Sequence, residues 1–361
     1  MNVRCLIPDL PSAEALLPYL RAMEAARWYT NFGPLVQRFE TEVRARLFPS
    51  FHVVTLSSAT AALELTIAAL ALPPGARVLL PAFTFPATAT AVLRAGLMPV
   101  LADVDAASWT LTPEQARAAL PRTQAALVIP VAAFGAPLPV EDWLAFTETT
   151  GVPVLFDAAA ALGNQHLAGR STAIFSLHAT KPFGVGEGGL LVTADGELAE
   201  RVHRLSNFGF QRKLIRQPGS NAKFSEFAAA VGLAQLERWP ERRALRLALW
   251  RDYRARLAVL PGIKLQQMPD NAAPVNVVVR SALGGERIVA GLAQQDIEAR
   301  RWYCPPLHLH PAFAACPRVG SDGSTSLPTC DALARDSAGL PFHPFLDRAA
   351  FDRIVGALEK L

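Results

Sequence analysis

Residues 173–193 read AIFSLHATKPFGVGEGGLLVT, and this stretch decides the fold. The runs AIFSLH (173–178) and GLLVT (189–193) are short and apolar on both faces, as expected of buried strands. Between them, Lys181 directly follows the first strand and precedes a glycine-rich turn. A lysine held at the mouth of a sheet can form a Schiff base with a carbonyl compound. The alternative interpretation is an ordinary exposed lysine in a loop.

The turn itself, GVGEGG (184–189), matches the G-x-G-x-x-G fingerprint of dinucleotide-binding proteins. That fingerprint must follow a strand and open a helix. Here the glycines are followed by the strand GLLVT, so we reject a nicotinamide or flavin site and, with it, a Rossmann oxidoreductase. The glycines instead allow the backbone to turn tightly beside Lys181.

Upstream of this stretch, the chain alternates short apolar strands with helices. Such strands predict a mostly parallel sheet, covered by helices on both faces, in an α/β fold. Thr112 is expected to cap a helix that has Pro113 in its first turn. The expected strands are 51–57, 76–81, 98–105, 126–131, 152–157, 173–178 and 189–193, and the expected helices are 58–70, 85–96, 112–120 and 139–150.

Downstream, residues 225–260 are strongly helical, and Pro240 is expected to break or kink this helix. An apolar strand at 275–280, a helix within 286–298 and the segment RRWYC (300–304) predict a smaller α+β unit. We therefore expect a large domain with the N-terminal segment over residues 1–240 and a small C-terminal α+β domain over residues 241–361. A chain of 361 residues is long enough for both.

The composition excludes several classes of protein. Hydrophobic residues make up 51% of the chain and charged residues 18%, which excludes global disorder. The net charge of +4 is spread without basic blocks, so we expect no nucleic-acid partner. The N-terminus lacks the pattern of a signal peptide, and the uncharged run 123–140 is interrupted by Pro130, Pro137 and Pro139. We expect a soluble, cytoplasmic protein with no membrane partner.

The cysteines and lysines are few. Four cysteines in 361 residues do not make a disulfide scaffold. Cys304, His308, His310 and Cys316 are close in sequence, but their spacing and the intervening prolines match no common zinc pattern, so we expect no metal site. Of the five lysines in the chain, only Lys181 follows a buried strand and precedes a tight glycine turn.

Three further groups of residues fit one site around Lys181. Asp157 ends an apolar strand, where its carboxylate can keep a pyridine nitrogen protonated, or can cap the following helix. The turn SSAT (57–60) joins a strand to a helix whose N-terminal amides can bind phosphate, or are simply capped. Phe83 or Phe85 can stack on a planar cofactor, or belong to the core. This order along one sheet is that of a pyridoxal phosphate (PLP) site.

With these residues in place, the chain resembles the PLP-dependent sugar aminotransferases of the DegT/DnrJ/StrS family, which have the three-layer fold-type I aminotransferase architecture. The resemblance runs from residue 28 almost to the C-terminus. Its motifs, in family order, are WYTNFGPLVQRFE (28–40), SATAAL (58–63), PAFTFPATATAV (81–92), FDAAAALG (156–163), FSLHATKPFGVGEGGLLVT (175–193), RLSNFGF (204–210), GSNAKFSEFAAAVGLAQLE (219–237), YCPPLHLHPAF (303–313) and LPFHP (340–344).

The resemblance implies roles for individual residues. Lys181 would carry PLP as a covalent internal aldimine and would shuttle protons. Asp157 would pair with the pyridine nitrogen, and Phe85 would stack on the ring. The phosphate would be held by the turn before the first helix and by the strand before the lysine, at Ser58, Ala59, Thr60 and Ser176.

The resemblance also implies a homodimer with shared active sites, because Asn221 occupies the position of an asparagine that reaches the neighbouring subunit's phosphate. The chain departs from the family at Ala59, where glycine is usual, and at Ala160, where glutamine or histidine lies near the cofactor in many members. The segment containing Trp302, Tyr303, His308 and His310 contacts substrate in relatives. We interpret Trp302 as a packing residue and assign none of the four to the site.

The implied reaction is a ping-pong transamination in amino-sugar and polysaccharide biosynthesis. Glutamate would donate the amino group, and a ketone on a nucleotide-linked deoxysugar would accept it. SLHATKPFG (176–184) and NFGF (207–210) are most similar to enzymes acting at C4 of a dTDP-4-keto-6-deoxyhexose, with C3 amination as the alternative. Sugar dehydratases of the family replace the lysine by histidine, so Lys181 favours transamination. A PLP enzyme acting on a non-sugar ketone or amino acid and a non-catalytic regulatory member stay open as further alternatives.

Overall fold

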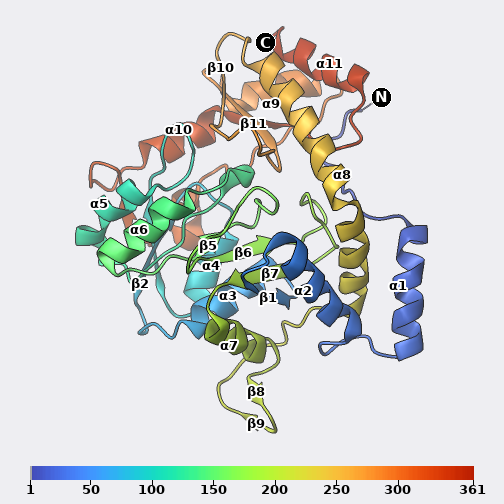
Figure 1. Cartoon of the computed structure of the whole chain (residues 1–361). Coiled ribbons are helices and arrows are strands. Elements are labelled where there is room, and N and C mark those ends of the chain that lie inside the picture. The colour runs from blue at the N-terminus through green and yellow to red at the C-terminus, as the bar shows by residue number, and fades with distance from the viewer. Residues whose placement is uncertain (1) are drawn as a thin grey trace.

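A mixed sheet forms the centre of the molecule in the computed structural model, which describes residues 2–361 (Figure 1). Within these residues, one four-stranded sheet has the order β1-β7-β6-β5 and another has the order β12-β3-β2-β4. Parallel bridges from Val128 to Val154 and from Val131 to Asp157 join the two sheets. Among their pairings, only those of β7 are antiparallel. The strands are β1 (His52–Leu56), β2 (Arg77–Pro81), β3 (Met98–Ala102), β4 (Leu127–Val128), β5 (Phe156–Asp157), β6 (Thr172–Ser176), β7 (Gly189–Thr193) and β12 (Arg318–Val319).

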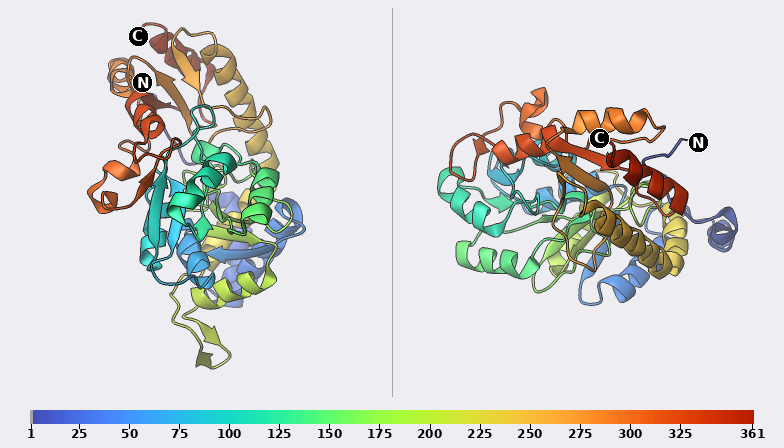
Figure 2. Two further views of the ribbon diagram at one scale, coloured as in Figure 1. Left: turned by 90° about the vertical axis from the view of Figure 1, so that its left-hand side faces the viewer. Right: turned by 90° about the horizontal axis from the view of Figure 1, so that it is seen from above.

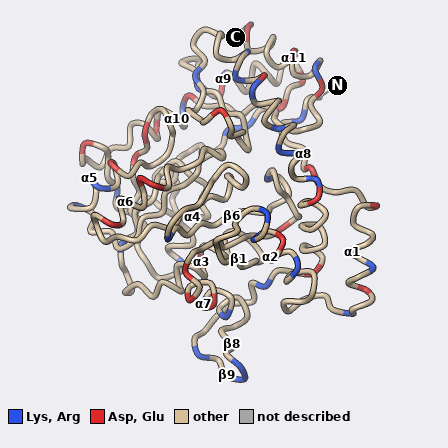
Figure 3. The backbone as a smooth tube through the Cα atoms, in the orientation of Figure 1, with Lys and Arg blue, Asp and Glu red and all other residues tan. Residues whose placement is uncertain are grey.

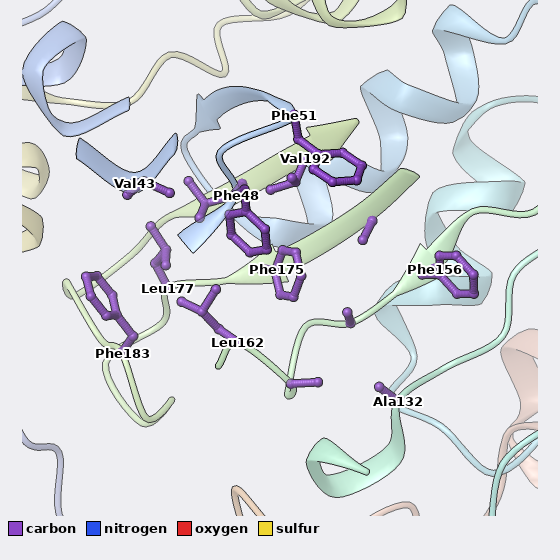
Figure 4. Close-up of a cluster of buried hydrophobic side chains, with 14 of the residues drawn as sticks. Val43, Phe48, Phe51, Ala132, Phe156, Leu162, Phe175, Leu177, Phe183 and Val192 are labelled. Atoms are coloured by element: carbon purple, nitrogen blue, oxygen red, sulfur yellow. The ribbon is translucent and has the colours of Figure 1, made fainter. Parts of the chain in front are cut away.

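Helices cover both faces of this sheet, because its strands are apolar on both sides. Leu190 and Val192 of β7 pack in one core, and Leu191 between them packs in the other. Figure 4 shows part of the first core, where Phe175 of β6 lies beside Phe48. The molecule is therefore a three-layer α/β fold. The first core includes α2 (Pro34–Leu47), α5 (Pro113–Thr123), α6 (Val140–Thr150) and part of α8 (Glu226–Leu257), and the second includes α3 (Ala59–Ala69), α4 (Ala87–Arg94) and α7 (Gly196–Ser206).

A smaller antiparallel sheet has the order β10-β11-β13. Its core contains Val279, Ile288 and Phe351, which come from β11, α9 and α11. The helix α8 runs from the large sheet to this small one, along one side of the molecule (Figures 1 and 2). The remaining elements of this part are β10 (Ile263–Leu265), β11 (Val277–Ser281), α9 (Gly285–Ala293), α10 (Pro328–Asp336), β13 (Ser337–Leu340) and α11 (Arg348–Leu358).

The helix α8 does not break at Pro240 but continues through this residue to Leu257, and the kink, the other expectation at this residue, stays a prediction. A proline inside a helix removes one backbone hydrogen bond, so neighbouring contacts have to hold the two halves together. Trp239 is buried in the first core. Arg243 Nε donates to the Gly163 carbonyl at 3.0 Å, and Arg246 donates to the Pro274 carbonyl at 2.9 Å. The division of the chain at residues 240 and 241 stays a prediction.

The predicted helix cap at Thr112 is confirmed. The Thr112 side chain accepts from the Gln115 N–H at 3.3 Å, and Gln115 accepts from the Thr112 N–H at 3.1 Å, which completes a capping box at the start of α5. The uncharged run 123–140 contains the end of α5, the short strand β4 and one helical turn. Over residues 2–361, no helix is both long and apolar enough to cross a membrane.

Two elements project from the body of the molecule. The strands β8 (Phe210–Gln211) and β9 (Leu214–Ile215) form a hairpin that extends away from α7 (Figure 2), and α1 (Ala13–Ala26) lies along the outside of α8. Phe210, Leu214 and Ile215 of the hairpin are exposed. Arg212 and Lys213 form its positively charged tip (Figure 3). Large apolar side chains gathered on an exposed element are typical of an interaction surface.

Candidate active site

A cavity of about 300 Å³ lies beyond the carboxyl ends of β1, β2, β5 and β6. This is where ligands bind in open α/β sheets. The predicted site residues that line it come from four different strand ends: Ser58, Ala59, Thr60, Phe85, Asp157, Ser176 and Lys181. Asn221 alone among the predicted site residues lies elsewhere. Its Oδ1 accepts from Lys223 at 2.8 Å near the base of the hairpin.

The loop 176–189 positions Lys181 through its own backbone. The Leu177 N–H donates to the Gly188 carbonyl at 2.9 Å, and the Ala179 N–H donates to Gly186 at 2.7 Å. The Lys181 N–H closes a turn on His178 at 2.8 Å. Gly186 has a φ of +103°, a conformation that other residues rarely adopt. The glycines therefore fix the loop in the shape that places the lysine against the cavity.

Lys181 and Asp157 form the electrostatic centre of the cavity. Asp157 is 4% exposed, and burial raises the pKa of its carboxyl group. The Thr88 hydroxyl, which donates at 2.7 Å, the Ala159 N–H at 3.2 Å and the charge of Lys181 oppose that shift. Burial in turn lowers the pKa of Lys181, and the Asp157 charge opposes this change. The lysine is thus brought towards its neutral, nucleophilic form.

The start of α3 forms a cradle for an anion. Ser58 caps the helix, and its Oγ accepts from the Ala61 N–H at 3.0 Å. The first amides of a helix have no intrahelical partner and favour a bound phosphate. A Cβ on Gly189 would lie 2.5 Å from the Ala59 nitrogen, so β7 packs directly against this turn. Ser176 ends the adjacent β6 beside it.

Two phenylalanines of the turn after β2 have different environments. Phe85 lines the cavity and is 61% exposed, so its ring is free to stack on a bound molecule. Phe83 is fully buried, and its ring packs edge-on against Phe134 and Tyr303. The residue pattern alone left open which of Phe83 and Phe85 is buried, because burial depends on the segments that cover the turn, and only the family resemblance selected Phe85 as the stacking ring.

Several residues of the cavity were missed by the sequence analysis. Trp302 and Tyr303 line it, and the Tyr303 ring stacks on Phe134 with centroids 4.7 Å apart. Asn276 also lines the cavity, from the segment that leads into β11. Thr88, which does not line the cavity but donates to the Asp157 carboxylate, was also missed, although its place three residues after Phe85 could have suggested it. No sequence signal marks the others, which reach the cavity from distant parts of the chain.

The profile of the DegT/DnrJ/EryC1/StrS aminotransferase family matches residues 12–359. The chain belongs to this family. The dTDP-3-amino-3,4,6-trideoxy-alpha-D-glucose transaminase of Streptomyces venezuelae is 33% identical to this aminotransferase over 362 residues, which cover 96% of this chain and 92% of that protein.

Solved structures of related proteins share the whole fold of this aminotransferase. A Bacillus cereus protein assigned as a PLP-dependent aminotransferase superposes with a TM-score of 0.91 at 29% identity, covering 99% of this chain and 100% of the other. DesI, solved in the presence of its TDP-sugar product, superposes with a TM-score of 0.88 at 30% identity, covering 100% of this chain and 94% of DesI. The protein is a PLP-dependent aminotransferase with the fold-type I architecture.

The residues present in this aminotransferase fit PLP. The helix terminus and Ser176 suit a phosphate, the exposed Phe85 ring suits a planar pyridine, and the buried Asp157 suits a ring nitrogen that carries a proton. Lys181 supplies an amine with a lowered pKa in the same cavity. Ala160, which also lines the cavity, contributes a methyl group and no polar atom.

Proposed function

We propose that this aminotransferase transfers an amino group from glutamate to a ketone on a nucleotide-linked deoxysugar. The observation that carries the proposal is the presence of Lys181, Asp157 and the N-terminus of α3 in one cavity of about 300 Å³. A sugar nucleotide as substrate is supported by the dTDP-sugar in the name of the Streptomyces venezuelae relative and by the TDP-sugar product of DesI.

Two ionisable groups of the cavity carry the chemistry in this proposal. Bound PLP supplies an electron-accepting ring that stabilises negative charge at the carbon that loses or gains the amino group. Lys181 holds the cofactor and moves a proton to and from that carbon, and its lowered pKa provides the neutral amine that this role requires. Asp157 accepts a hydrogen bond from the ring nitrogen and keeps it protonated.

The remaining residues hold the cofactor in place. The Ser58 oxygen already accepts from the Ala61 N–H, so its hydroxyl proton is free to donate to the phosphate. Ala59 offers only its amide, which alanine supplies as well as glycine does in a helical conformation. Phe85 would stack on the ring. The methyl group of Ala160 leaves the cofactor and substrate without a side-chain hydrogen bond from that position.

We further propose that Asn221 of the partner subunit completes the phosphate site in a homodimer. The exposed apolar hairpin beside Asn221 supports a second copy as the partner. Mixing Lys181→Ala chains with Asn221→Ala chains tests the arrangement. If the asparagine acts across the interface, a mixed dimer contains one intact site and regains activity. If it acts within its own chain, every site in the mixture lacks one of the two groups and the mixture stays inactive.

The position of amination is proposed as C4 of a dTDP-4-keto-6-deoxyhexose, with C3 as the alternative that the name of the Streptomyces venezuelae relative favours. The protein is incubated with PLP, glutamate and each purified keto-sugar nucleotide, and the product is identified by mass spectrometry and NMR. A product aminated at C3 overturns the C4 assignment.

Discharge of the cofactor's visible band by glutamate without any amino-sugar product indicates a non-sugar ketone, and failure to bind PLP indicates a non-catalytic member. Lys181→Ala should lose both the visible band and turnover.

A further inference from the structure

His178 and Glu187 lie at the rim of the cavity, on the loop that carries Ser176 and Lys181. Their side chains are 45% and 70% exposed, so both are accessible to a molecule that enters the cavity. Neither is needed to hold the phosphate, the ring or the ring nitrogen of the cofactor. They are therefore available to the second substrate, whose ketone has to approach Lys181.

The tautomer of His178 follows from its neighbours. The Thr180 N–H donates to Nδ1 at 3.3 Å, and the Thr180 hydroxyl lies 2.9 Å from the same atom. Because a backbone N–H can only donate, we assign Nδ1 as the acceptor, and the neutral ring carries its proton on Nε2. That Nε2 faces the Glu187 carboxylate at 3.6 Å, which is longer than a hydrogen bond. The Nε2–H donor of His178 and the carboxylate acceptor of Glu187 thus lie side by side, and each can form a further hydrogen bond with a ligand.

The backbone holds this pair without relying on the ligand. His178 forms an isolated bridge with Gly186 across the turn, next to the hydrogen bond from Ala179 to Gly186. The two side chains are therefore brought together by the same hydrogen bonds that fix Lys181. A binding group placed on a rigid loop loses little entropy when it engages a ligand.

We propose that His178 and Glu187 recognise a hydroxyl group next to the ketone of the acceptor substrate, an inference that rests on the proposed sugar aminotransferase activity. A hydroxyl group is both an acceptor and a donor, so it can accept from His178 Nε2 and donate to the Glu187 carboxylate. A carboxylate cannot donate, and it is repelled by Glu187. Among the described residues that line the cavity, the other charged side chains are Asp157 and Lys181, which serve the cofactor.

The pair therefore distinguishes between the ketone and glutamate, which bind to the same cavity one after the other. A hydroxylated ketone gains a hydrogen bond to a charged group, whereas glutamate brings two carboxylates towards Glu187. Removing the charge of Glu187 should consequently weaken binding of the ketone and strengthen binding of the donor. A residue with a purely structural role would not move the two constants in opposite directions.

The experiment measures each half-reaction of the PLP-loaded enzyme separately. Glu187→Gln should raise KM for the hydroxylated keto-sugar nucleotide about tenfold to hundredfold, and it should lower KM for glutamate about threefold. His178→Phe, which removes the donor, should raise KM for the same ketone. A deoxy analogue lacking the adjacent hydroxyl should bind wild-type enzyme and Glu187→Gln equally well. Glu200→Gln, an exposed carboxylate on α7 that does not line this cavity, is the matched control and should leave every constant unchanged.

The outcomes separate this inference from the activity on which it rests. Equal KM changes for the hydroxylated ketone and its deoxy analogue would overturn the pair as a hydroxyl site, as would an unchanged KM for the ketone in both variants. Failure of the wild-type enzyme to aminate any keto-sugar nucleotide overturns the proposed function as well. That failure is visible before any variant is made.

Discussion

Replacing Gly189 by alanine tests the contact between β7 and the phosphate turn. An added Cβ would lie 2.5 Å from the Ala59 nitrogen and 2.5 Å from the carbonyl carbon and oxygen of Ser58. Favourable carbon contacts lie near 3.5 Å, so the turn or the strand would have to move by about 1 Å. These are backbone atoms at the start of a buried helix, and they cannot swing aside as the end of a flexible side chain can.

The displacement should have two effects. Forcing an extra methyl group into a filled backbone contact costs about 1–3 kcal/mol of stability. Because the Ala59 and Thr60 amides belong to the same turn, a shift of this size should also weaken PLP binding about tenfold or more. Urea unfolding of the apoenzyme measures the first effect, and titration of the cofactor's visible band measures the second.

The matched control is Gly356→Ala in α11, where an added Cβ would meet nothing within 4 Å. There the same substitution should stabilise the protein by about 0.5–1 kcal/mol, because alanine is the better helix former, and it should leave PLP affinity unchanged. If Gly189→Ala unfolds at the wild-type urea concentration and binds PLP with wild-type affinity, the turn is not confined by β7 and the reasoning fails.

Two further predictions concern Asp157 and Lys181, and a third concerns Arg246, which donates to the carbonyls of residues 274 and 275. Thr88→Val removes the 2.7 Å hydrogen bond that stabilises the Asp157 carboxylate, so the pKa of Asp157 should rise further. The acidic limb of the pH profile of kcat should then move to higher pH, and a limb that does not move contradicts this reasoning. Asp157→Asn removes the charge that raises the pKa of Lys181, so the pH dependence of Lys181 labelling by an amine-reactive reagent should shift to lower pH in the apoenzyme, and a shift upwards would refute the coupling. Arg246→Met leaves two carbonyl groups of segment 274–275 without their donor, and thermal unfolding should show a loss of about 2–4 kcal/mol, whereas a loss below about 0.5 kcal/mol would show that the carbonyls find other partners.

The sequence predicted those parts of the fold that depend on local patterns. Alternation of short apolar strands with helices is enough to place a three-layer sheet, because strands of this kind have to be covered on both faces. Thr112 was assigned as a cap on residue type and position alone. The expected break at Pro240 is not found, because the contacts of Trp239 and Arg246 that hold α8 together are tertiary and have no local signal.

The same distinction between local patterns and tertiary contacts applies to the residues of the site. Lys181, Asp157 and Ser58 follow strand ends, and strand ends of a parallel sheet meet at one edge, so their proximity could be predicted. Trp302 and Asn276 reach the same cavity from elements more than ninety residues further along, which spacing cannot reveal. Asn221 lies outside the cavity of its own chain, and its predicted role depends on a second copy.

The last strand of the large sheet, β12, comes from residues 318–319 and pairs with β3, which lies more than two hundred residues earlier. The cavity is likewise lined by Leu6 at one end of the chain and by Trp302 towards the other. A chain emerging from the ribosome can therefore build the floor of the site, from residue 58 to residue 181, long before its edge strand and outer wall exist. Contacts of such long sequence separation slow folding and leave sheet edges open in the meantime. Synthesis of residues 302–319 is thus the step that turns a partly formed sheet into a closed enzyme.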